Sequence, residues 1–402
     1  MDRKKNVPKI RFQNFEDEWL DSTIGRHISL LNGRAYKQEE LLDEGKYKVL
    51  RVGNFNTNSK WYYSNLELEE NKYVNKGDLL YLWATNFGPE IWTEEKAIYH
   101  YHIWKLEFDR TEINQDYLNI WLESDKNKIQ QNTNGSTMVH ITKTMMEERG
   151  ISLPNFDEQS AIGSLFRTLD ELLASYKDNL TNYQSLKATM LSKMFPKAGQ
   201  TVPEIRLDGF EGEWVEKRLK DISKRVTRKN NDLVSERALT ISAQFGLIDQ
   251  EEFFQKKIAS KDVSGYYLIK KGEFAYNKSY STGYPLGAIK RLDKYENGVL
   301  STLYIIFKAV DVDSDYLAHY YESDKWHREV SMCAAEGARN HGLLNIAPVD
   351  FFNTRLVVPK ELEEQRAIGA YFSNLDNLIN SHQEKISQLE TLKKKLLQDM
   401  FI

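Results

Sequence analysis

The 402-residue sequence lacks several features that would assign it to a class at once. It has one cysteine, Cys333, so it offers neither a disulfide framework nor a thiolate metal cluster. No apolar run approaches the ~20 residues that span a membrane, and the N-terminal MDRKKNVP has no apolar signal core. These absences favour a chain of the reducing cytoplasm that makes no use of a membrane.

Recognisable catalytic motifs are absent as well. The sequence contains neither a G-x-x-x-x-G-K-[ST] phosphate loop nor a G-x-G-x-x-G turn, and no histidines and cysteines have the spacing of a zinc site. Glu90, Glu94 and Glu95 with Lys96 are a weak match to a carboxylate–lysine nuclease site, and a charged surface loop explains them better. We therefore expect no catalytic residue, no metal site and no cofactor site in this chain.

The charge balance gives no global preference for nucleic acid. The chain carries 55 basic and 59 acidic residues, which leaves a net charge of −4. Any DNA-binding surface must therefore be local. The length is sufficient for two or three domains.

What the sequence does contain is a long repeat. EQSAIG at 158–163 and MF at 194–195 bound the first copy, and EQRAIG at 364–369 and MF at 400–401 bound the second. Both ends have the same offset, since 364 − 158 = 206 and 401 − 195 = 206. Two segments of equal length therefore repeat without an insertion.

Each copy predicts a long helix with one apolar stripe. Apolar residues recur at alternating intervals of three and four, which is the a/d pattern of a coiled coil. The stripe residues are Ile162, Leu165, Leu169, Leu172, Tyr176, Tyr183, Leu186 and Met190 in the first copy, and Ile368, Tyr371, Leu375, Leu378, Leu389, Leu392 and Leu396 in the second. At ~1.5 Å per residue each helix would be ~55 Å long, which does not suit the interior of one compact domain.

The stripe becomes polar in the middle of both copies. Asn179 falls at a d position, and His382 and Lys385 fall at a and d. If the two helices pair antiparallel, these residues meet, and a polar layer there would fix the register of the coiled coil. A solvent-exposed break in an imperfect stripe is the alternative.

A second repeat lies before each body of the chain. PKIRF at 8–12 leads to Trp19, and PEIRL at 203–207 leads to Trp214, at an offset of 203 − 8 = 195. We expect these arms to pack their aromatic residues beneath a domain. The chain then divides into a first arm and body, a central helix, a second arm and body, and a C-terminal helix, at 1–155, 156–197, 198–360 and 361–402.

The two bodies predict the same mixed structure. Body one has β-like stretches followed by one helix, at 47–52, 77–82, 98–106 and 116–131. ESDK at 123–126 recurs at 322–325, an offset of 322 − 123 = 199, so the bodies share a frame but differ by insertions. The predicted fold class is α+β, with two pseudo-two-fold-related β-rich bodies separated by a long antiparallel two-helix coiled coil.

Candidate DNA contacts lie in a basic run that opens body two and in polar loops of both bodies. Arg and Lys can neutralise phosphates or pair with guanine, and Asn and Gln can pair with adenine. The candidates in body one are Arg34, Tyr36, Lys37, Arg51, Asn54, Asn56, Lys60, Thr85, Asn86, Gly135, Ser136, Thr137 and Lys143. Those in body two are Arg225, Arg228, Lys229, Ser242, Gln244, Asn277, Lys278, Ser279, Tyr280, Arg339, Asn340 and His341. A solvated helix face for the basic run, and ordinary loop chemistry for each other residue, are the alternatives.

With its paired EQ-x-AIG…MF helices and repeated P-x-IR…EW arms, the whole chain resembles the specificity subunits of type I restriction–modification systems. TISAQFG at 240–246 and FAYNKS at 274–279 are also similar to a recurring type of recognition domain in those proteins. The resemblance implies two target-recognition domains in body one and body two. It also implies a non-catalytic subunit that binds a bipartite, asymmetric double-stranded DNA target, one half per domain.

The resemblance further implies protein partners. Two modification subunits would methylate adenine with S-adenosylmethionine, and restriction subunits would use ATP and Mg²⁺. The helices would set the gap between half-sites and dock the modification subunits. Two other interpretations stay open from the residues alone: a coiled-coil scaffold with two protein-binding modules, and a self-sufficient nuclease or methyltransferase.

Overall fold

The computed structural model forms two compact units. Unit 1 comprises Met1–Lys177 with Glu384–Ile402, and unit 2 comprises Asp178–Gln383. The boundary divides both long helices, α4 (Phe156–Lys193) and α10 (Leu362–Asp399), so each unit holds one body and a part of each helix. The structure describes residues 7–55, 58–84, 87–132, 141–242, 245–256, 259–260, 262–279, 283–333 and 344–401.

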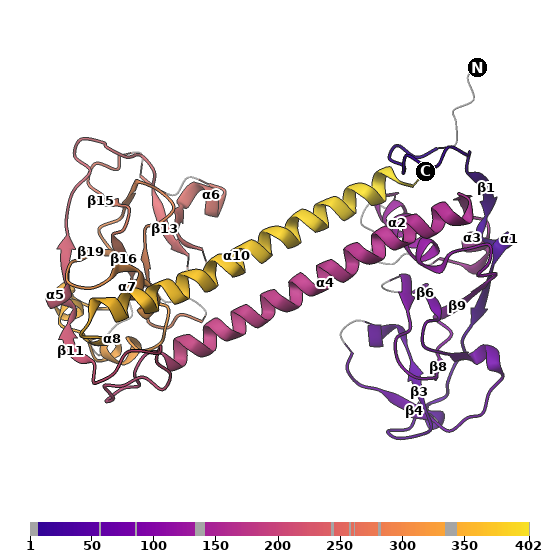
Figure 1. Cartoon of the computed structure of the whole chain (residues 1–402), viewed down its shortest axis with the longest axis horizontal. Coiled ribbons are helices and arrows are strands. Elements are labelled where there is room, and N and C mark those ends of the chain that lie inside the picture. Colours follow the sequence, from indigo (N-terminus) through magenta and orange to yellow (C-terminus); the bar gives the residue numbers. More distant parts are fainter. Residues whose placement is uncertain are drawn as a thin grey trace, which may run out of the picture. The chain divides into compact units, whose positions relative to one another are not determined.

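The body of unit 1 is built on a four-stranded antiparallel sheet in the order β2-β9-β6-β7 (Figure 1). A second sheet has the order β4-β3-β8-β5, and β1 pairs with β10. The strands are β1 (Leu20–Thr23), β2 (Ile28–Asn32), β3 (Tyr47–Leu50), β4 (Tyr62–Ser64), β5 (Tyr73–Val74), β6 (Leu79–Leu82), β7 (Gly88–Ile91), β8 (Ala97–Tyr99), β9 (Ile103–Phe108) and β10 (Gly150–Leu153). The helices of this body are α1 (Ile24–His27), α2 (Gln115–Asn132) and α3 (Lys143–Glu147), with 3-10 turns at Gln38–Glu40, Val52–Phe55 and Glu70–Lys72.

The body of unit 2 repeats this frame. Its four-stranded sheet has the order β12-β19-β16-β17, β11 pairs with β20, and the pairs β13-β14 and β15-β18 complete it. The strands are β11 (Val215–Arg218), β12 (Ser223–Val226), β13 (Leu239–Ser242), β14 (Gly246–Asp249), β15 (Tyr267–Lys270), β16 (Phe274–Asn277), β17 (Ala288–Arg291), β18 (Asn297–Leu300), β19 (Ile305–Ala309) and β20 (Arg355–Val358). The helices are α5 (Leu219–Ile222), α6 (Gln250–Phe254), α7 (Ser314–Tyr320), α8 (His327–Cys333) and α9 (Pro348–Phe352).

The central strand β6 is buried on both faces, and alternation along it separates two cores. Leu79 and Tyr81 join the cluster that contains α2, whereas Leu80 and Leu82 join the cluster between the two sheets. This is the two-residue period of a strand, which sends successive side chains to opposite faces. The predicted α+β fold, with two β-rich regions and two long helices that pack together, is thereby confirmed.

The predicted strand at 98–106 is wrong in one respect. The chain turns at His100–His102, between β8 and β9, because these strands belong to different sheets. β8 pairs with β3 and β5, whereas β9 pairs with β2 and β6. The apolar and aromatic residues on both sides of the turn hide it from a search for strand periodicity.

The repeated glutamate of EQ-x-AIG attaches each arm to its helix. The Glu158 carboxylate accepts hydrogen bonds from Arg11 at 2.7 Å and from the Trp19 indole at 3.2 Å. Glu364 accepts the same bonds from Arg206 at 2.7 and 2.8 Å and from Trp214 at 3.2 Å. The buried tryptophans agree with the expected packing of the arms, and the ion pair adds a reason for the arginine in each arm.

The glutamine and glycine of the same motif attach the helix to its body. The Gln159 amide bonds the backbone at Asn114 and Pro154, and Gln365 does the same at Asp313 and Pro359. A Cβ on Gly163 would lie 2.7 Å from the Asp116 Cβ at the start of α2, so only glycine permits this approach.

The MF ends of the two helices fill the opposite core. Phe195, after α4, stacks on Phe372 in unit 2, and Phe401, after α10, lies against Phe166 in unit 1. The arms continue from these ends, since Ile205 N donates to Lys193 O and Ile10 N donates to Asp399 O, both at 3.0 Å. Each unit therefore joins the end of one long helix to the start of the other.

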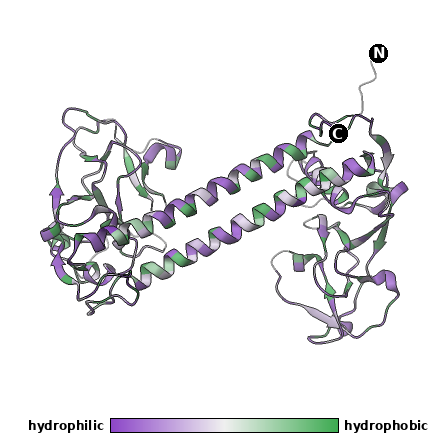
Figure 2. Ribbon diagram, in the orientation of Figure 1, coloured by the Kyte–Doolittle hydropathy of each residue, from purple (hydrophilic) through white to green (hydrophobic). Residues whose placement is uncertain are grey.

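The predicted helices are confirmed, but the predicted stripe is wrong at alternate positions. Leu172, Leu186, Leu378 and Leu392 are exposed, and Leu165 and Tyr371 are only partly buried. Figure 2 shows apolar and polar residues alternating along α4 and α10. The more buried positions are those one residue later than predicted, namely Phe166, Leu173, Leu180 and Lys187 in α4 and Phe372, Ile379, Ile386 and Lys393 in α10. Apolar residues occupy most positions of both candidate stripes, and in the folded chain the buried stripe is the one that places Phe166 and Phe372 in the cores.

This shift corrects the predicted polar layer. Asn179 and Lys385 are exposed, so they do not lie in the stripe. His382 is half-buried, and its ring lies 5.2 Å from that of Tyr183 in unit 2. Among the described residues, no helix is long and apolar enough to cross a membrane.

Candidate nucleic-acid interface

Several candidate residues of unit 1 are bound within the chain itself. The Arg34 guanidinium donates to both oxygens of Glu40, at 3.2 and 2.7 Å, and its charge lies 5.3 Å from the Tyr36 ring. The Tyr36 hydroxyl donates to Tyr99 O at 3.3 Å, and burial raises the pKa of Tyr36. Arg34 and Tyr36 thus hold the segment before β3 in place.

The loop after β3 is braced by Asn54. Its side chain accepts from Arg51 N at 3.0 Å and donates to Lys60 O at 3.1 Å. The Lys60 ammonium lies 5.0 Å from the Tyr62 ring. Lys37 and Lys143 are exposed, and Lys143 lies 3.6 Å from Glu147.

Arg51 differs from these residues. Its guanidinium lies over the Tyr62 ring at 4.3 Å, and its buried Nε has no hydrogen-bond partner in the described part of the chain. An arginine that lies over an aromatic ring and has no ion pair within the described residues can still use its terminal nitrogens to bind a base or a phosphate.

The basic run of unit 2 likewise contains residues that are bonded within the chain and one that is not. Arg228 donates to both oxygens of Glu273, at 3.3 and 3.0 Å, and Lys229 donates to Gly265 O at 2.7 Å. Arg225, on β12, is exposed, and across the described residues its side chain has no ion pair. Among these three, Arg225 is therefore the one whose charge has no ion-pair partner within the described residues.

The polar loop residues of unit 2 mostly shape their own turns. Ser242 Oγ accepts from Phe245 N at 3.2 Å, and Asn277 Oδ1 accepts from Ser279 N at 3.0 Å. Lys278 Nζ donates to Ile346 O at 3.2 Å, and burial lowers the pKa of Lys278.

The remaining candidates lie outside the described residues. They are Asn56, Thr85, Asn86, Gly135, Ser136, Thr137, Gln244, Tyr280, Arg339, Asn340 and His341. Their DNA contacts stay predictions.

Two surface features were not predicted from the sequence. In unit 2, Lys224 on β12 lies directly opposite Lys308 on β19, and both are exposed. Like charges opposite one another destabilise a sheet, so this pair suits a bound anion. In unit 1, an aromatic cluster surrounds the His100–His102 turn and includes Trp83. Both features depend on the pairing of strands that lie far apart in the sequence, so no local motif predicts them.

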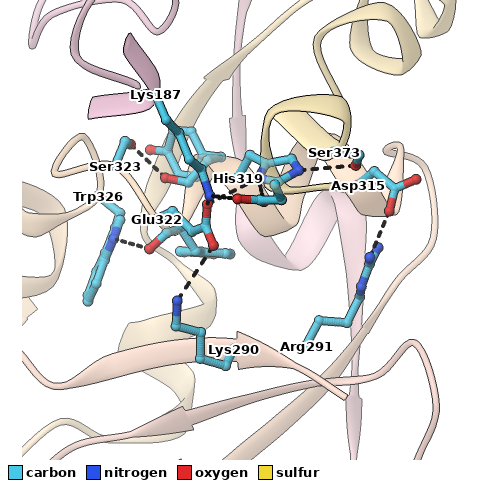
Figure 3. Close-up of polar contacts among 12 residues, drawn as sticks. Lys187, Lys290, Arg291, Asp315, His319, Glu322, Ser323, Trp326 and Ser373 are labelled. Atoms are coloured by element: carbon cyan, nitrogen blue, oxygen red, sulfur yellow. Dashed lines mark hydrogen bonds and ion pairs between the residues drawn. The ribbon is translucent and has the colours of Figure 1, made fainter. Parts of the chain in front are cut away.

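A cluster of charged residues joins the body of unit 2 to both long helices. Lys187 of α4 lies 2.7 Å from Glu322, which follows α7, and 2.5 Å from Asp376 of α10 (Figure 3). His319 bonds Glu322 at 3.1 Å, and Lys290 lies 3.7 Å from it. Burial raises the pKa of Glu322, but the His319 bond and the charges of Lys187 and Lys290 outweigh it and hold that pKa far below its usual range.

The lysine of this cluster takes the place that a metal ion would otherwise occupy. The ligand atoms of His319, Glu322 and Asp376 lie within 4.8 Å of one another. The Lys187 ammonium already lies between the two carboxylates and supplies the positive charge. Unit 1 has the equivalent arrangement, in which Lys393 lies 3.1 Å from Glu123 and 2.8 Å from Asp170. The offsets are the repeats already seen, since 393 − 187 = 206 and 322 − 123 = 199.

Two equivalent β-rich units, each attached to both long helices, give the protein a modular architecture. A family model described as the type I restriction modification DNA specificity domain matches residues 16–182. The type I restriction enzyme MjaVIII specificity subunit of Methanocaldococcus jannaschii is 23% identical over 412 residues, covering 98% of this chain and 95% of its own. The EcoBI specificity subunit of Escherichia coli is 25% identical over 163 residues, 40% of this chain and 34% of its own.

Solved structures share the fold over the whole chain. The S subunit of the M. genitalium type I restriction–modification system superposes with a TM-score of 0.60 at 17% identity, covering 98% of this chain and 99% of that one. A second structure comes from work on complex assembly and conformational transition of the type I R-M system. It superposes with a TM-score of 0.50 at 14% identity, covering 96% of this chain and 98% of that one. Residues 16–182 belong to the type I restriction–modification DNA specificity family, and nearly the whole chain is similar to a type I specificity subunit, as the resemblance implied.

Proposed function

We propose that unit 1 and unit 2 each read one half of a bipartite, asymmetric DNA sequence. The observation that carries this proposal is the contrast between a repeated frame and unlike surfaces. The Glu–Arg–Trp, glutamine, glycine and lysine contacts recur in both units, whereas Arg51 with the His100–His102 turn and the Lys224–Lys308 pair each occur in one. Equivalent modules with different surfaces suit two different half-sites.

The paired helices suit the role of a spacer. Each has 38 residues, or ~57 Å at ~1.5 Å per residue. Half-sites read from one face of DNA lie ~34 Å apart, one helical turn. The helices are long enough to hold two reading modules at such a separation.

The outer surface of the helices suits two copies of one protein partner. Exposed apolar residues recur 206 residues apart, so each helix offers the same set. The pairs, with exposed fractions, are Phe156 (39%) with Leu362 (38%), Leu172 (41%) with Leu378 (40%), and Leu186 (37%) with Leu392 (43%). We assign this surface to two modification subunits, which transfer methyl groups from S-adenosylmethionine to adenine.

Restriction subunits that use ATP and Mg²⁺ complete the proposed complex. A subunit directed to DNA works where that DNA lies, so we place the complex in the cytoplasm. The specificity chain itself contributes recognition and geometry. Purified alone with DNA, Mg²⁺ and S-adenosylmethionine, it should neither cut nor methylate.

The test uses the chain assembled with its modification subunits. Affinity for target DNA should fall steeply between 50 and 200 mM salt, by about 10³-fold or more if six or more phosphates are contacted. Insertion of one heptad into both helices, after Asp178 and after Glu384, should lengthen the spacer of the methylated motif and leave both half-sites unchanged. Insertion into one helix alone is the control and should abolish binding. A changed half-site after the double insertion would contradict the spacer role.

A further inference from the structure

The turn between β8 and β9 has a backbone that is fixed from three sides. His100 N donates to Leu50 O at 2.8 Å, Tyr101 N to Arg34 O at 3.1 Å, and Trp83 N to His102 O at 3.3 Å. Within the turn, Ile103 N donates to His100 O at 3.0 Å. The side chains of this turn therefore have a defined position before any ligand binds.

The rings of the turn are packed on one another and on the core. Tyr101 lies 4.0 Å from His102 and 4.4 Å from His100, between ring centroids. His102 lies 4.9 Å from Trp83, which stacks at 5.9 Å on the buried Trp104. Tyr101, at 39% exposure, is the most exposed ring of this cluster. Side chains fixed in this way lose little conformational entropy on binding.

Two side chains of the turn retain unused hydrogen-bonding groups. Within the described part of the chain, neither the His100 ring nor the Tyr101 hydroxyl has a hydrogen-bond partner. Burial lowers the pKa of His100 to about 4, with smaller effects of the charges of His102 and Arg51, so the ring is neutral at pH 7. A neutral imidazole has one donor and one acceptor, and a tyrosine hydroxyl can do either.

Arg51 lies next to this turn. It directly follows Leu50, whose carbonyl accepts from His100 N. Its guanidinium lies over the Tyr62 ring, which restrains its position, and its Nε is buried with no hydrogen-bond partner among the described residues. Glu40 and Glu273 consume the donors of Arg34 and Arg228, and Arg51 has no such carboxylate among the described residues.

We infer that Arg51, His100 and Tyr101 form a base-reading edge of unit 1, in which Arg51 pairs with a guanine in the major groove. This inference rests on the proposed function. Bidentate pairing of arginine with guanine O6 and N7 needs a planar guanidinium held in place, which the Tyr62 ring provides. Unit 2 has Ser301–Tyr304 at the equivalent turn between β18 and β19, so this edge belongs to one half-site only.

The experiment measures binding of the assembled complex to the target and to duplexes with each base pair of the target substituted in turn. Arg51→Ala should weaken target binding about 10- to 100-fold and remove discrimination at one base pair of one half-site. Tyr101→Phe and His100→Ala should reduce discrimination at neighbouring base pairs, by smaller factors than Arg51→Ala. Arg110→Ala, an exposed arginine of the same unit, is the matched control and should leave the preference at every base pair unchanged.

Salt dependence separates base reading from a phosphate contact. Arg51→Ala should leave the slope of affinity against salt unchanged, because a base contact releases no counterion. A uniform loss over all duplexes, with a slope reduced by about one, would overturn the inference, and so would no change at all. If Arg51→Ala does not fold, Tyr101→Phe, which removes one hydroxyl, decides the question. A wild-type complex with no sequence preference would overturn the proposed function itself, whereas unaffected variants of a specific complex defeat this inference alone.

Discussion

Unit 1 and unit 2 share the contacts that attach a body to the long helices and differ in side chains that face away from them. Glu158 and Glu364 bind an arginine and a tryptophan of each arm with nearly the same distances. By contrast, the exposed cross-strand pair Lys224–Lys308 of unit 2 corresponds to Ser29–Glu107 in unit 1. The comparison shows that the repeat preserves attachment, while the surfaces available for recognition diverge.

The difference extends into the attachment sites at one position. His319 of unit 2 lies three residues before Glu322 and bonds it, and the equivalent residue before Glu123 in unit 1 is Ile120. The carboxylate in unit 2 thus has three partners, His319, Lys187 and Lys290, where Glu123 has the Lys393 ion pair. The two units should therefore lose different amounts of stability when Lys187 of unit 2 or Lys393 of unit 1 is replaced.

The largest effect is expected from the glutamate of each EQ-x-AIG motif. Glu158→Ala removes the buried carboxylate that pairs with Arg11 and accepts from the Trp19 indole, and should destabilise unit 1 by about 3–5 kcal/mol. Glu364→Ala should cost unit 2 a similar amount. Urea unfolding followed by hydrogen exchange of each unit measures both. Lys9→Ala, which removes an exposed ion pair with Asp399, is the control and should change stability by less than about 1 kcal/mol.

A smaller loss of stability, again equal in the two units, is expected when the glycine of each EQ-x-AIG motif is replaced. Alanine at 163 or 369 would bring a Cβ within 2.7 or 2.8 Å of the neighbouring helix start, so Gly163→Ala and Gly369→Ala should each cost about 1–3 kcal/mol. Thermal unfolding provides the measurement, with the exposed Ser164→Ala as the control. A loss in one unit only would show that the two helix attachments are not equivalent.

The lysine clusters should reveal the asymmetry. Lys393→Met leaves Glu123 facing Asp170 without a cation and should cost unit 1 about 2 kcal/mol, whereas Lys187→Met should cost unit 2 less, because His319 and Lys290 remain. Hydrogen exchange in α2 and α7 follows both units, and equal losses would refute the asymmetry.

The smallest effect on stability is expected on the outer face of the helices. Leu172→Glu and Leu378→Glu change exposed side chains, so each should alter stability by no more than about 0.5 kcal/mol. Each should nevertheless remove one modification subunit from the complex, and the double variant should remove both. Native mass spectrometry counts the subunits, with Glu171→Gln as the control. Full assembly of the double variant would show that the partners bind elsewhere.

The sequence predicted the positions of the long helices better than it predicted which of two apolar stripes on each helix is buried. The repeated segments 158–195 and 364–401 lie within two residues of α4 and α10 at each end, so the 206-residue offset was enough to place both helices. It could not decide between Leu165 and Phe166, or between Leu172 and Leu173, since all four are apolar. That choice depends on which side chain reaches the core of a body folded from other parts of the chain.

The candidate DNA contacts show the same limit. Residue type made Arg34, Arg51 and Arg228 equal candidates. Glu40 follows Arg34 closely, but Glu273 lies 45 residues from Arg228, and only the folded sheet brings them together. The His100–His102 turn was missed because its surroundings have the composition of a continuous strand.

The most direct test of the central claim, that each unit reads one half-site, is the methylated DNA motif in cells that carry this chain with its modification subunits. That motif should be compared with the motif obtained after residues 215–358 are replaced by the second body of another member of the family. The account predicts one half-site changed, the other retained and the spacer length the same. A change in both half-sites, or in neither, would contradict it.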